Sequence, residues 1–194
     1  MFNLIQRSAS KAIAACAIAA TFIAAPASAT TLSFVPSSNQ VAVGGNVAVD
    51  IRISDIGAGD DLGVFDFNVL FNASVLNLTG YALGTGLGDV NSGDGFDFGA
   101  GSIGSGKFNL AELSFLSDLS SQASSFSLGT LYFTSVGAGS SLFSFSDVVL
   151  GDAFGNALTA DLGNATISAV PEPQTVFLFL SGLGLVALLR RKQQ

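Results

Sequence analysis

Residues 47–53 read Val47-Ala48-Val49-Asp50-Ile51-Arg52-Ile53, a strict alternation of branched apolar side chains with small or charged ones. Successive side chains of a β-strand point to opposite faces, so one face of this segment is wholly apolar and the other is largely polar. The stretch therefore predicts a β-strand that covers a hydrophobic core on one side only.

The segment 64–71 repeats this pattern with phenylalanine. Phe65, Phe67, Val69 and Phe71 are expected to face inward, and Asp66 and Asn68 outward. Further strands are expected at Leu32–Val35, Val75–Leu83, Phe108–Phe115, Phe126–Val136, Leu142–Leu150 and Ala165–Ala169, separated by glycine-rich turns. Eight or nine short strands without a helical period predict an all-β sandwich or barrel. Residues 84–106 are rich in glycine and aspartate and are expected to form a long loop, and the polar loop 118–125 has room for one helical turn.

The charge of this domain is strongly negative. Of the chain's 14 acidic side chains, all but Glu172 lie between Thr30 and Val170, where only Arg52 and Lys107 are basic. Such a surface repels nucleic acid and anionic lipid, so neither is expected as a partner.

Catalytic chemistry has little support in the sequence. The chain contains no histidine, which removes the usual general base and the commonest zinc ligand. Two carboxylates would suffice for a glycosidase, but the acidic residues show no spacing that selects a pair. We expect a protein that is not an enzyme and that has no resident cofactor.

The first 29 residues have the layout of a signal peptide. Arg7 and Lys11 precede an apolar run over 12–25, and Ala27 and Ala29 form a small-x-small cleavage site. Recognition by the Sec export machinery and signal peptidase is therefore expected, with a mature chain from Thr30. A lipoprotein cleavage box ending at Cys16, the only cysteine, is the alternative, but too few apolar residues precede it.

The chain ends on a second targeting pattern. Pro171, Glu172 and Pro173 precede an uncharged apolar segment over 176–189, which is followed by Arg190, Arg191 and Lys192. As a helix this segment would measure roughly 21 Å, which is short for a hydrocarbon core of about 30 Å. The basic end should stay in the cytoplasm, so the segment suits a temporary stop in the membrane better than a permanent anchor. The alternative is a buried C-terminal helix of the domain.

The order of these three elements, over residues 171–194, resembles the PEP-CTERM sorting signal of Gram-negative bacteria. The resemblance implies processing by a membrane transpeptidase-like enzyme, an exosortase. It further implies export through the inner membrane, transient anchoring by the C-terminal helix, and delivery to the outer cell surface or the medium.

The domain between the two targeting segments, over residues 30–170, is similar to cohesin-like domains. The segment 41–53 resembles their first strands, and 64–76 resembles their segment of the form G-(A/V)-F-x-F-x-(L/V)-x-(F/Y)-(D/N)-x-x-V-L. Residues 129–134 and 142–151 resemble their late strands. The resemblance implies a single jelly-roll sandwich related to carbohydrate-binding and dockerin-binding modules, and no residue matches a dockerin contact.

Two groups of residues are candidate binding sites. Asp89, Asn91, Asp94 and Asp97 offer the oxygen ligands that calcium takes, although aspartate and asparagine also favour turns for their own sake. Phe96 and Phe98 are either an exposed pair that contacts a ligand or a plug over the end of the sandwich, and the plug is preferred.

Two functions remain, both non-catalytic. The first is a structural protein of the cell surface or extracellular matrix, in a biofilm or exopolysaccharide setting. The second is a surface module that recognises a polysaccharide or a protein partner through a sandwich face or its end loops.

Overall fold

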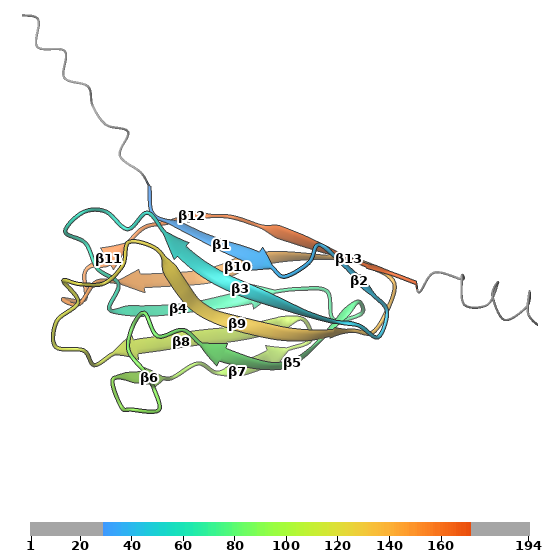
Figure 1. The fold of residues 1–194 in the computed structure, drawn as a ribbon, viewed down its shortest axis with the longest axis horizontal. Coiled ribbons are helices and arrows are strands. Elements are labelled where there is room, and N and C mark those ends of the chain that lie inside the picture. The colour runs from blue at the N-terminus through green and yellow to red at the C-terminus, as the bar shows by residue number, and fades with distance from the viewer. Residues whose placement is uncertain (1–28, 172–194) are drawn as a thin grey trace, which may run out of the picture.

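The computed structural model describes residues 29–171, which form two β-sheets packed face to face (Figure 1). No helix occurs among these residues, and the all-β sandwich expected from the sequence is confirmed. In particular, the described part holds no helix long and apolar enough to cross a membrane. Of the expected targeting segments only Ala29 and Pro171 fall within this range, and the apolar segment 176–189 lies outside it.

Thirteen strands make up the described part, more than the eight or nine expected, because five of them are very short. They are β1 (Thr31–Pro36), β2 (Gln40–Ala42), β3 (Asn46–Ser54), β4 (Val64–Leu70), β5 (Leu76–Leu83), β6 (Gly95–Asp97), β7 (Gly101–Gly104), β8 (Lys107–Ser114), β9 (Phe126–Ser135), β10 (Gly139–Gly151), β11 (Ala157–Leu158), β12 (Asp161–Leu162) and β13 (Ala165–Val170). Each of the eight longer segments expected from the sequence coincides with one of these strands.

The first sheet has the strand order β12-β1-β3-β9-β5, and the second has β2-β13-β10-β4-β8-β6. In the second sheet, β11 also pairs with β10, and β7 with β8. Among the described pairs only β1–β12 and β13–β2 are parallel. The chain passes from one sheet to the other at most of its connections, including those between β3 and β4, β4 and β5, β8 and β9, and β9 and β10, so most strand neighbours are distant in sequence.

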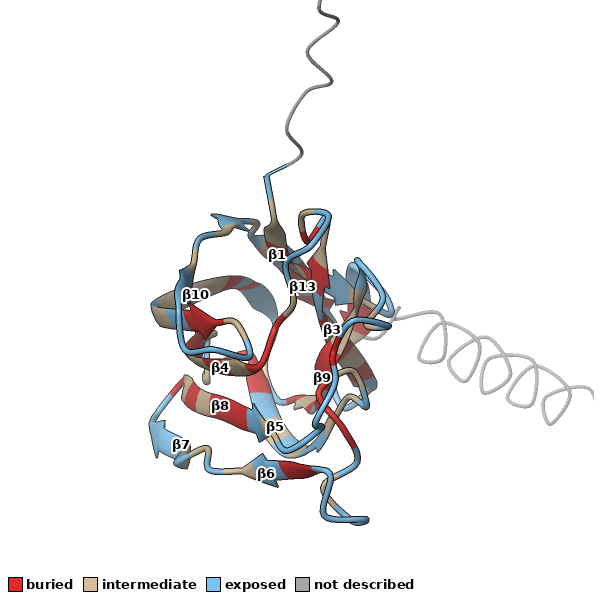
Figure 2. Cartoon of the chain, turned by 90° about the vertical axis from the view of Figure 1, so that its left-hand side faces the viewer, coloured by how far each residue is buried: buried red, intermediate tan, exposed pale blue. Residues whose placement is uncertain are grey.

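The apolar faces predicted for the two decisive segments form the core. Val47, Val49, Ile51 and Ile53 are at most 4 % exposed, and Phe65, Phe67 and Val69 are fully buried. Figure 2 shows the buried positions gathered between the two sheets, with the loops exposed. Apolar surface removed from water on this scale is the main source of stability for a domain without disulfides.

Phenylalanine rings connect the two sheets across the core. Phe34 of β1 stacks on Phe145 of β10 with ring centroids 4.0 Å apart. Phe133 of β9 meets Phe143 of β10 at 5.3 Å in an edge-to-face arrangement, and Phe71 contacts both of these rings. These contacts fix the position of one sheet on the other, because tilted and offset ring pairs have preferred geometries.

The prediction of a long loop over residues 84–106 is partly wrong. Two short strands, β6 and β7, lie inside it and pair with β8 at the edge of the second sheet. Strands of three and four residues carry too little alternation to be recognised in a glycine-rich segment. The hydrogen bonds that hold them come from the free edge of β8, which the sequence does not place beside them.

Phe143→Ala is expected to lower the free energy of unfolding by about 3–5 kcal/mol, because it leaves a cavity where three aromatic rings meet. Phe154→Ala removes a ring of the same size that is 89 % exposed, so this matched control is expected to leave stability within about 0.5 kcal/mol of wild type. Urea unfolding of the exported protein measures both values. Similar stabilities for the two variants would show that the ring cluster does not hold the sheets together.

Candidate functional site

The outer face of the second sheet carries an exposed apolar cluster. Phe96 of β6, Leu113 of β8, and Phe98 and Phe115, which follow those two strands, are 38–57 % exposed. We refer to these four residues as the aromatic edge. Phe96 lies opposite Leu113 in the strand register, and its ring stacks on that of Phe115 with centroids 6.2 Å apart. The cluster is therefore continuous and faces solvent.

The preferred interpretation of Phe96 and Phe98 as a plug is wrong. Phe98 donates its N–H to the carbonyl of Ala111, 3.2 Å away, so the segment continues to follow β8. Strand alternation then turns Phe96 and Phe98 to the outer face and Asp97 to the inner one. Pairing with β8, which is a tertiary contact, decides the direction of the rings.

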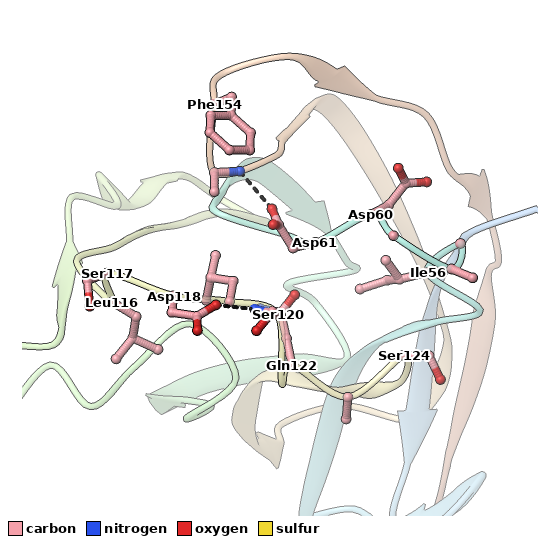
Figure 3. A pocket seen from close by; sticks show the side chains of 16 residues that line it. Ile56, Asp60, Asp61, Leu116, Ser117, Asp118, Ser120, Gln122, Ser124 and Phe154 are labelled. Carbon is pink, nitrogen blue, oxygen red and sulfur yellow. Dashed lines mark hydrogen bonds between the residues drawn. The ribbon is translucent and has the colours of Figure 1, made fainter.

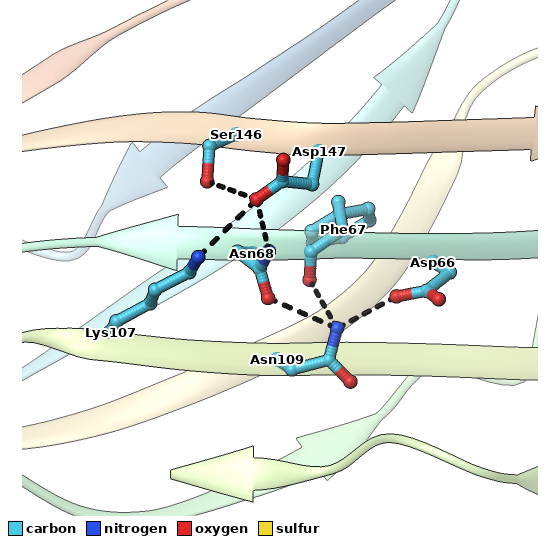
Figure 4. Close-up of polar contacts among 7 residues, drawn as sticks. All are labelled: Asp66, Phe67, Asn68, Lys107, Asn109, Ser146 and Asp147. Carbon is cyan, nitrogen blue, oxygen red and sulfur yellow. Dashed lines mark hydrogen bonds and ion pairs between the residues drawn. The ribbon is translucent and has the colours of Figure 1, made fainter. Parts of the chain in front are cut away.

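A polar network lies on the same face of the sheet as the aromatic edge, and its side chains are drawn in Figure 4. At its centre, Asp147 of β10 accepts hydrogen bonds through Oδ2 from the Asn68 side-chain amide at 2.7 Å and from Ser146 Oγ at 3.1 Å. Lys107 Nζ of β8 lies 3.3 Å from the same oxygen and forms an ion pair with it. Three neighbouring strands thus direct their side chains to one carboxylate.

Asn109 extends this network along β8. Its side-chain amide donates to Asp66 Oδ1 at 2.7 Å and to Asn68 Oδ1 at 3.2 Å, and its Oδ1 accepts the N–H of Ala100 at 2.7 Å. Each partner holds the next in one orientation, so the polar side chains are fixed before any ligand arrives.

Asp147 has an unusual backbone conformation that serves this arrangement. Its φ of 53° lies in the left-handed region, and it sits where the register between β10 and β4 shifts. A β-bulge of this kind re-aims a side chain. The hydrogen bond from Asn68 and the ion pair with Lys107 hold the pKa of the Asp147 carboxyl below its ordinary value. Sequence analysis did not single out Asp147, although the loss of alternation after Ser146 was a usable signal.

A second feature that sequence analysis missed is a buried acid. Glu112 of β8 is fully buried, and neither of its carboxylate oxygens has a hydrogen-bond partner among residues 29–171. Burial, together with the neighbouring Asp97 carboxylate, raises the pKa of Glu112 to about 7. A Cβ at Gly95 would lie 2.8 Å from Glu112 Oε1, so β6 closes directly over this carboxyl. The sequence did hold a sign of this burial. Glu112 follows Phe108 and Leu110 at every second position of the strand, so alternation places all three side chains on the inward face.

Asp97 connects β6 to the other sheet. Its Oδ2 accepts a hydrogen bond of 2.6 Å from the Tyr81 hydroxyl of β5, and its Oδ1 accepts the N–H of Gly99 at 3.0 Å. The Tyr81 ring also packs on Phe108, at 5.1 Å between centroids. The Asp97 carboxylate raises the pKa of the Tyr81 hydroxyl, because the ionised phenol could no longer donate this bond.

The candidate calcium ligands are occupied by local contacts. Asp89 Oδ1 accepts the N–H of Asn91 at 2.8 Å, and Asp94 Oδ2 accepts a hydrogen bond from Ser92 Oγ at 2.8 Å. Asp97 is engaged by Tyr81 and Gly99. Within residues 29–171, no group of three His, Cys, Asp or Glu side chains is placed to hold a metal ion. Calcium binding by these residues stays a prediction.

Residues 169–193 match the family model described as the PEP-CTERM protein-sorting motif. This range contains the Pro-Glu-Pro, apolar and basic elements of the chain's end. The motif implies export and sorting, with anchoring at the C-terminus before processing. The comparison with curated proteins gives no match.

Solved structures similar to the domain are cohesin modules. The cohesin module of a family 33 glycoside hydrolase from Clostridium perfringens is 13 % identical, has a TM-score of 0.61, and aligns over 74 % of this chain and 98 % of its own. The sixth cohesin of scaffoldin B from Acetivibrio cellulolyticus was solved in complex with a dockerin. It is 17 % identical, has a TM-score of 0.60, and aligns over 74 % of this chain and 100 % of its own. A non-cellulosomal cohesin from the archaeon Archaeoglobus fulgidus is 15 % identical and has a TM-score of 0.58. It aligns over 77 % of this chain and 97 % of its own.

These findings define the class of protein in two parts. The domain is a β-sandwich with the cohesin fold. The chain that contains it carries a PEP-CTERM sorting motif at its end, as the sequence pattern predicted.

Glu112 generates a prediction about pH. Its pKa is about 7 in the folded protein and 4.5 in the unfolded chain, so between these values the folded state binds more protons. Stability should therefore fall as pH rises from 5 to 8, by about 1–2 kcal/mol.

Glu112→Gln cannot titrate and should flatten this dependence. Its thermal unfolding midpoint is expected to match wild type at pH 5 and to exceed it at pH 8. Parallel midpoint curves for the two proteins between pH 5 and 8 would contradict the assignment.

Proposed function

We propose that the protein is an exported, exosortase-processed surface protein whose domain binds a protein partner through the outer face of the second sheet. The observation that carries the proposal is that the aromatic edge and a fixed polar network share that face. Export by the Sec machinery, removal of residues 1–29 by signal peptidase, and delivery to the outer surface or extracellular matrix are parts of the same proposal.

The aromatic edge supports docking on energetic grounds. Contiguous exposed apolar side chains leave apolar surface in water, and in a monomeric domain such a patch commonly marks an interaction site. Aromatic side chains are among the most frequent sources of binding energy at protein interfaces. Phe96 and Phe115 already stack on each other, so little side-chain entropy remains to be lost on binding.

The polar network supports specificity. Asp66, Asn68, Lys107 and Asn109 are held in one arrangement by mutual hydrogen bonds and by the carboxylate of Asp147. A partner that presents complementary donors and acceptors would bind without reorganising them. The negative charge of the whole domain favours a neutral or basic partner.

The opposite face of the sandwich has a different character. Outward residues of β3 and β9 there include Asp50, Arg52, Thr130 and Thr134, with Tyr132 as an exposed aromatic side chain. The two faces therefore differ in apolar content, and the second sheet is the better docking surface. Among the structural neighbours, the Acetivibrio cohesin was solved with a dockerin bound, which agrees with a protein partner for this fold.

A non-catalytic role is part of the proposal. The chain has no histidine, and the one strongly perturbed carboxyl among the described residues, Glu112, is buried without access to a substrate. A purely structural role in a biofilm matrix would need no saturable partner, and the docking experiment below separates the two roles.

The ends of the mature protein test the sorting part of the proposal. Mass spectrometry of the native protein from surface and culture-medium fractions should give a chain that begins near Thr30 and ends close to Pro171–Pro173. An intact Gln194 on the accumulated protein would mean that the C-terminal segment is a lasting anchor and that the processing step does not occur.

Photo-crosslinking in the native host tests the docking surface. With p-benzoylphenylalanine in place of Phe115, a discrete protein adduct is expected in the surface fraction. The same group in place of Tyr132, an exposed aromatic residue on the opposite face, is the matched control and should give none. Combining Phe96→Ala and Phe98→Ala should lower the adduct yield about tenfold or more, because each ring supplies hot-spot contact area. Equal adducts at both positions, or none at Phe115, would contradict docking on this face.

A further inference from the structure

Three loops enclose a cavity of about 590 Å³ at one end of the sandwich (Figure 3). They are the β3–β4 loop (55–63), the β8–β9 loop (115–125) and the β10–β11 loop (152–156). We refer to this cavity as the tip pocket. Its volume falls within the range of about 300–1,000 Å³ that ligand sites in proteins commonly occupy. It shares no residue with the aromatic edge, although one of its lining residues, Leu116, directly follows Phe115 in the chain.

Hydrogen bonds between the three loops fix the shape of the tip pocket. The Gln122 side chain accepts the N–H of Leu62 at 2.8 Å and donates to the carbonyl of the same residue at 3.0 Å. The Ile56 N–H donates to the carbonyl of Ser124 at 3.0 Å, and the Ala153 N–H donates to Asp61 Oδ1 at 2.7 Å. Each loop is thus tied to another, and a ligand would meet a preformed site.

Phe154 stands at the rim of the tip pocket and is 89 % exposed. The turn that carries it is held by Asp152, whose Oδ1 accepts the N–H groups of Phe154 at 2.8 Å and of Asn156 at 2.7 Å. The Asn156 side chain donates to Asp152 Oδ2 at 2.7 Å, and these bonds lower the pKa of the Asp152 carboxyl. The ring is therefore presented to solvent by an ordered turn.

The polar lining of the tip pocket consists of carboxylates, hydroxyls and the side-chain amide of Gln122. Asp60, Asp61 and Asp118 line the cavity, although the Asp60 carboxylate points away from Asp118 and Gln122 (Figure 3), and three serines add hydroxyl groups, namely Ser117, Ser120 and Ser124. The Ser120 N–H donates to Asp118 Oδ1 at 2.8 Å and lowers the pKa of this carboxyl, so Asp118 is ionised at neutral pH. None of the lining residues is positively charged. An anionic ligand would be repelled, and a ligand rich in hydroxyl donors would be matched.

We propose that the tip pocket binds a neutral polysaccharide, with Phe154 stacking on the apolar C–H face of one hexose ring and Asp61 and Asp118 accepting hydrogen bonds from its hydroxyls. A pyranose ring has an apolar face and a rim of hydroxyl donors. The pocket offers an exposed aromatic ring for the first and carboxylate acceptors for the second. The inference uses the exported location in the proposed function but not the docking surface, so either can fail without the other.

The position of the pocket in the fold agrees with a surface role. β3 runs from the end of the sandwich where Val43 bonds to Val170 to the end where the pocket lies. Its nine residues span about 30 Å at 3.3 Å per residue. Pro171 therefore leaves the domain at the opposite end from the tip pocket (Figure 1). The tip pocket and the point where the described chain ends are thus separated by the length of the sandwich.

Isothermal titration of the full chain with soluble hexasaccharides tests the proposal. The probes are β-1,4-glucan, β-1,3-glucan, α-1,4-glucan and β-1,4-mannan hexamers, with hexagalacturonate as the anionic control. At least one neutral probe is expected to bind at millimolar concentration or below. Hexagalacturonate is expected not to bind, because its carboxylates would meet those of the pocket.

Variants assign the binding to this pocket. Phe154→Ala is expected to weaken the affinity about tenfold, the equivalent of one aromatic contact. Asp118→Asn should weaken it by a smaller factor. Phe115→Ala, on the aromatic edge, is the matched control, which should bind the sugar as wild type does. Thermal unfolding of each variant checks that it is folded.

Four results would overturn the proposal, and the first three concern the probes and the Phe154 ring. They are no binding of any neutral probe, equal binding of hexagalacturonate, and a Phe154→Ala variant with wild-type affinity. Loss of sugar binding in Phe115→Ala would place the sugar site on the sheet face and would also overturn it.

Discussion

The two sheets are held in one relative position by a connected cluster of phenylalanine rings. Phe34 and Phe133 come from the first sheet, and Phe67, Phe143 and Phe145 come from the second. The domain has no cysteine after Cys16 and few opposite charges, so neither disulfides nor ion pairs can take over this role. Everything on the outer surface depends on this packing, because it fixes which face of each strand is turned to solvent.

The cluster of phenylalanine rings does not extend to the edge where β5 faces β6. There the sandwich is closed by the Tyr81–Asp97 hydrogen bond and by Glu112 beneath β6, in place of aliphatic side chains. A buried carboxyl without a partner is unfavourable in its ionised form, and a second carboxylate nearby makes it more so. β6, which lies directly over Glu112, also carries Phe96, so the aromatic edge lies next to the carboxyl of the described residues whose pKa is raised most.

The features that we assign to recognition occupy separate parts of the molecule. The aromatic edge and the polar network around Asp147 share the outer face of the second sheet. The tip pocket lies at one end of the sandwich, and the chain leaves toward its sorting motif at the other end. A chain anchored at its C-terminus would thus expose both candidate surfaces at once. This division explains how one domain of modest size could bind a protein and a polysaccharide without competition between them.

The local properties of the chain can be predicted from its amino-acid sequence. The alternation in segments such as 47–53 and 64–71 predicted the strands, their inward residues and the sandwich, because side-chain period and turn composition are local. The order of elements after Pro171 predicted the sorting motif for the same reason. Which strands become neighbours depends on the three-dimensional packing of the whole domain. This packing brought Asn68, Lys107 and Asp147 together from three strands, turned Phe96 and Phe98 outward through pairing with β8, and gathered three distant loops around the tip pocket. These sites depend on contacts between residues far apart in the chain, and such contacts form only once the core fixes the sheets.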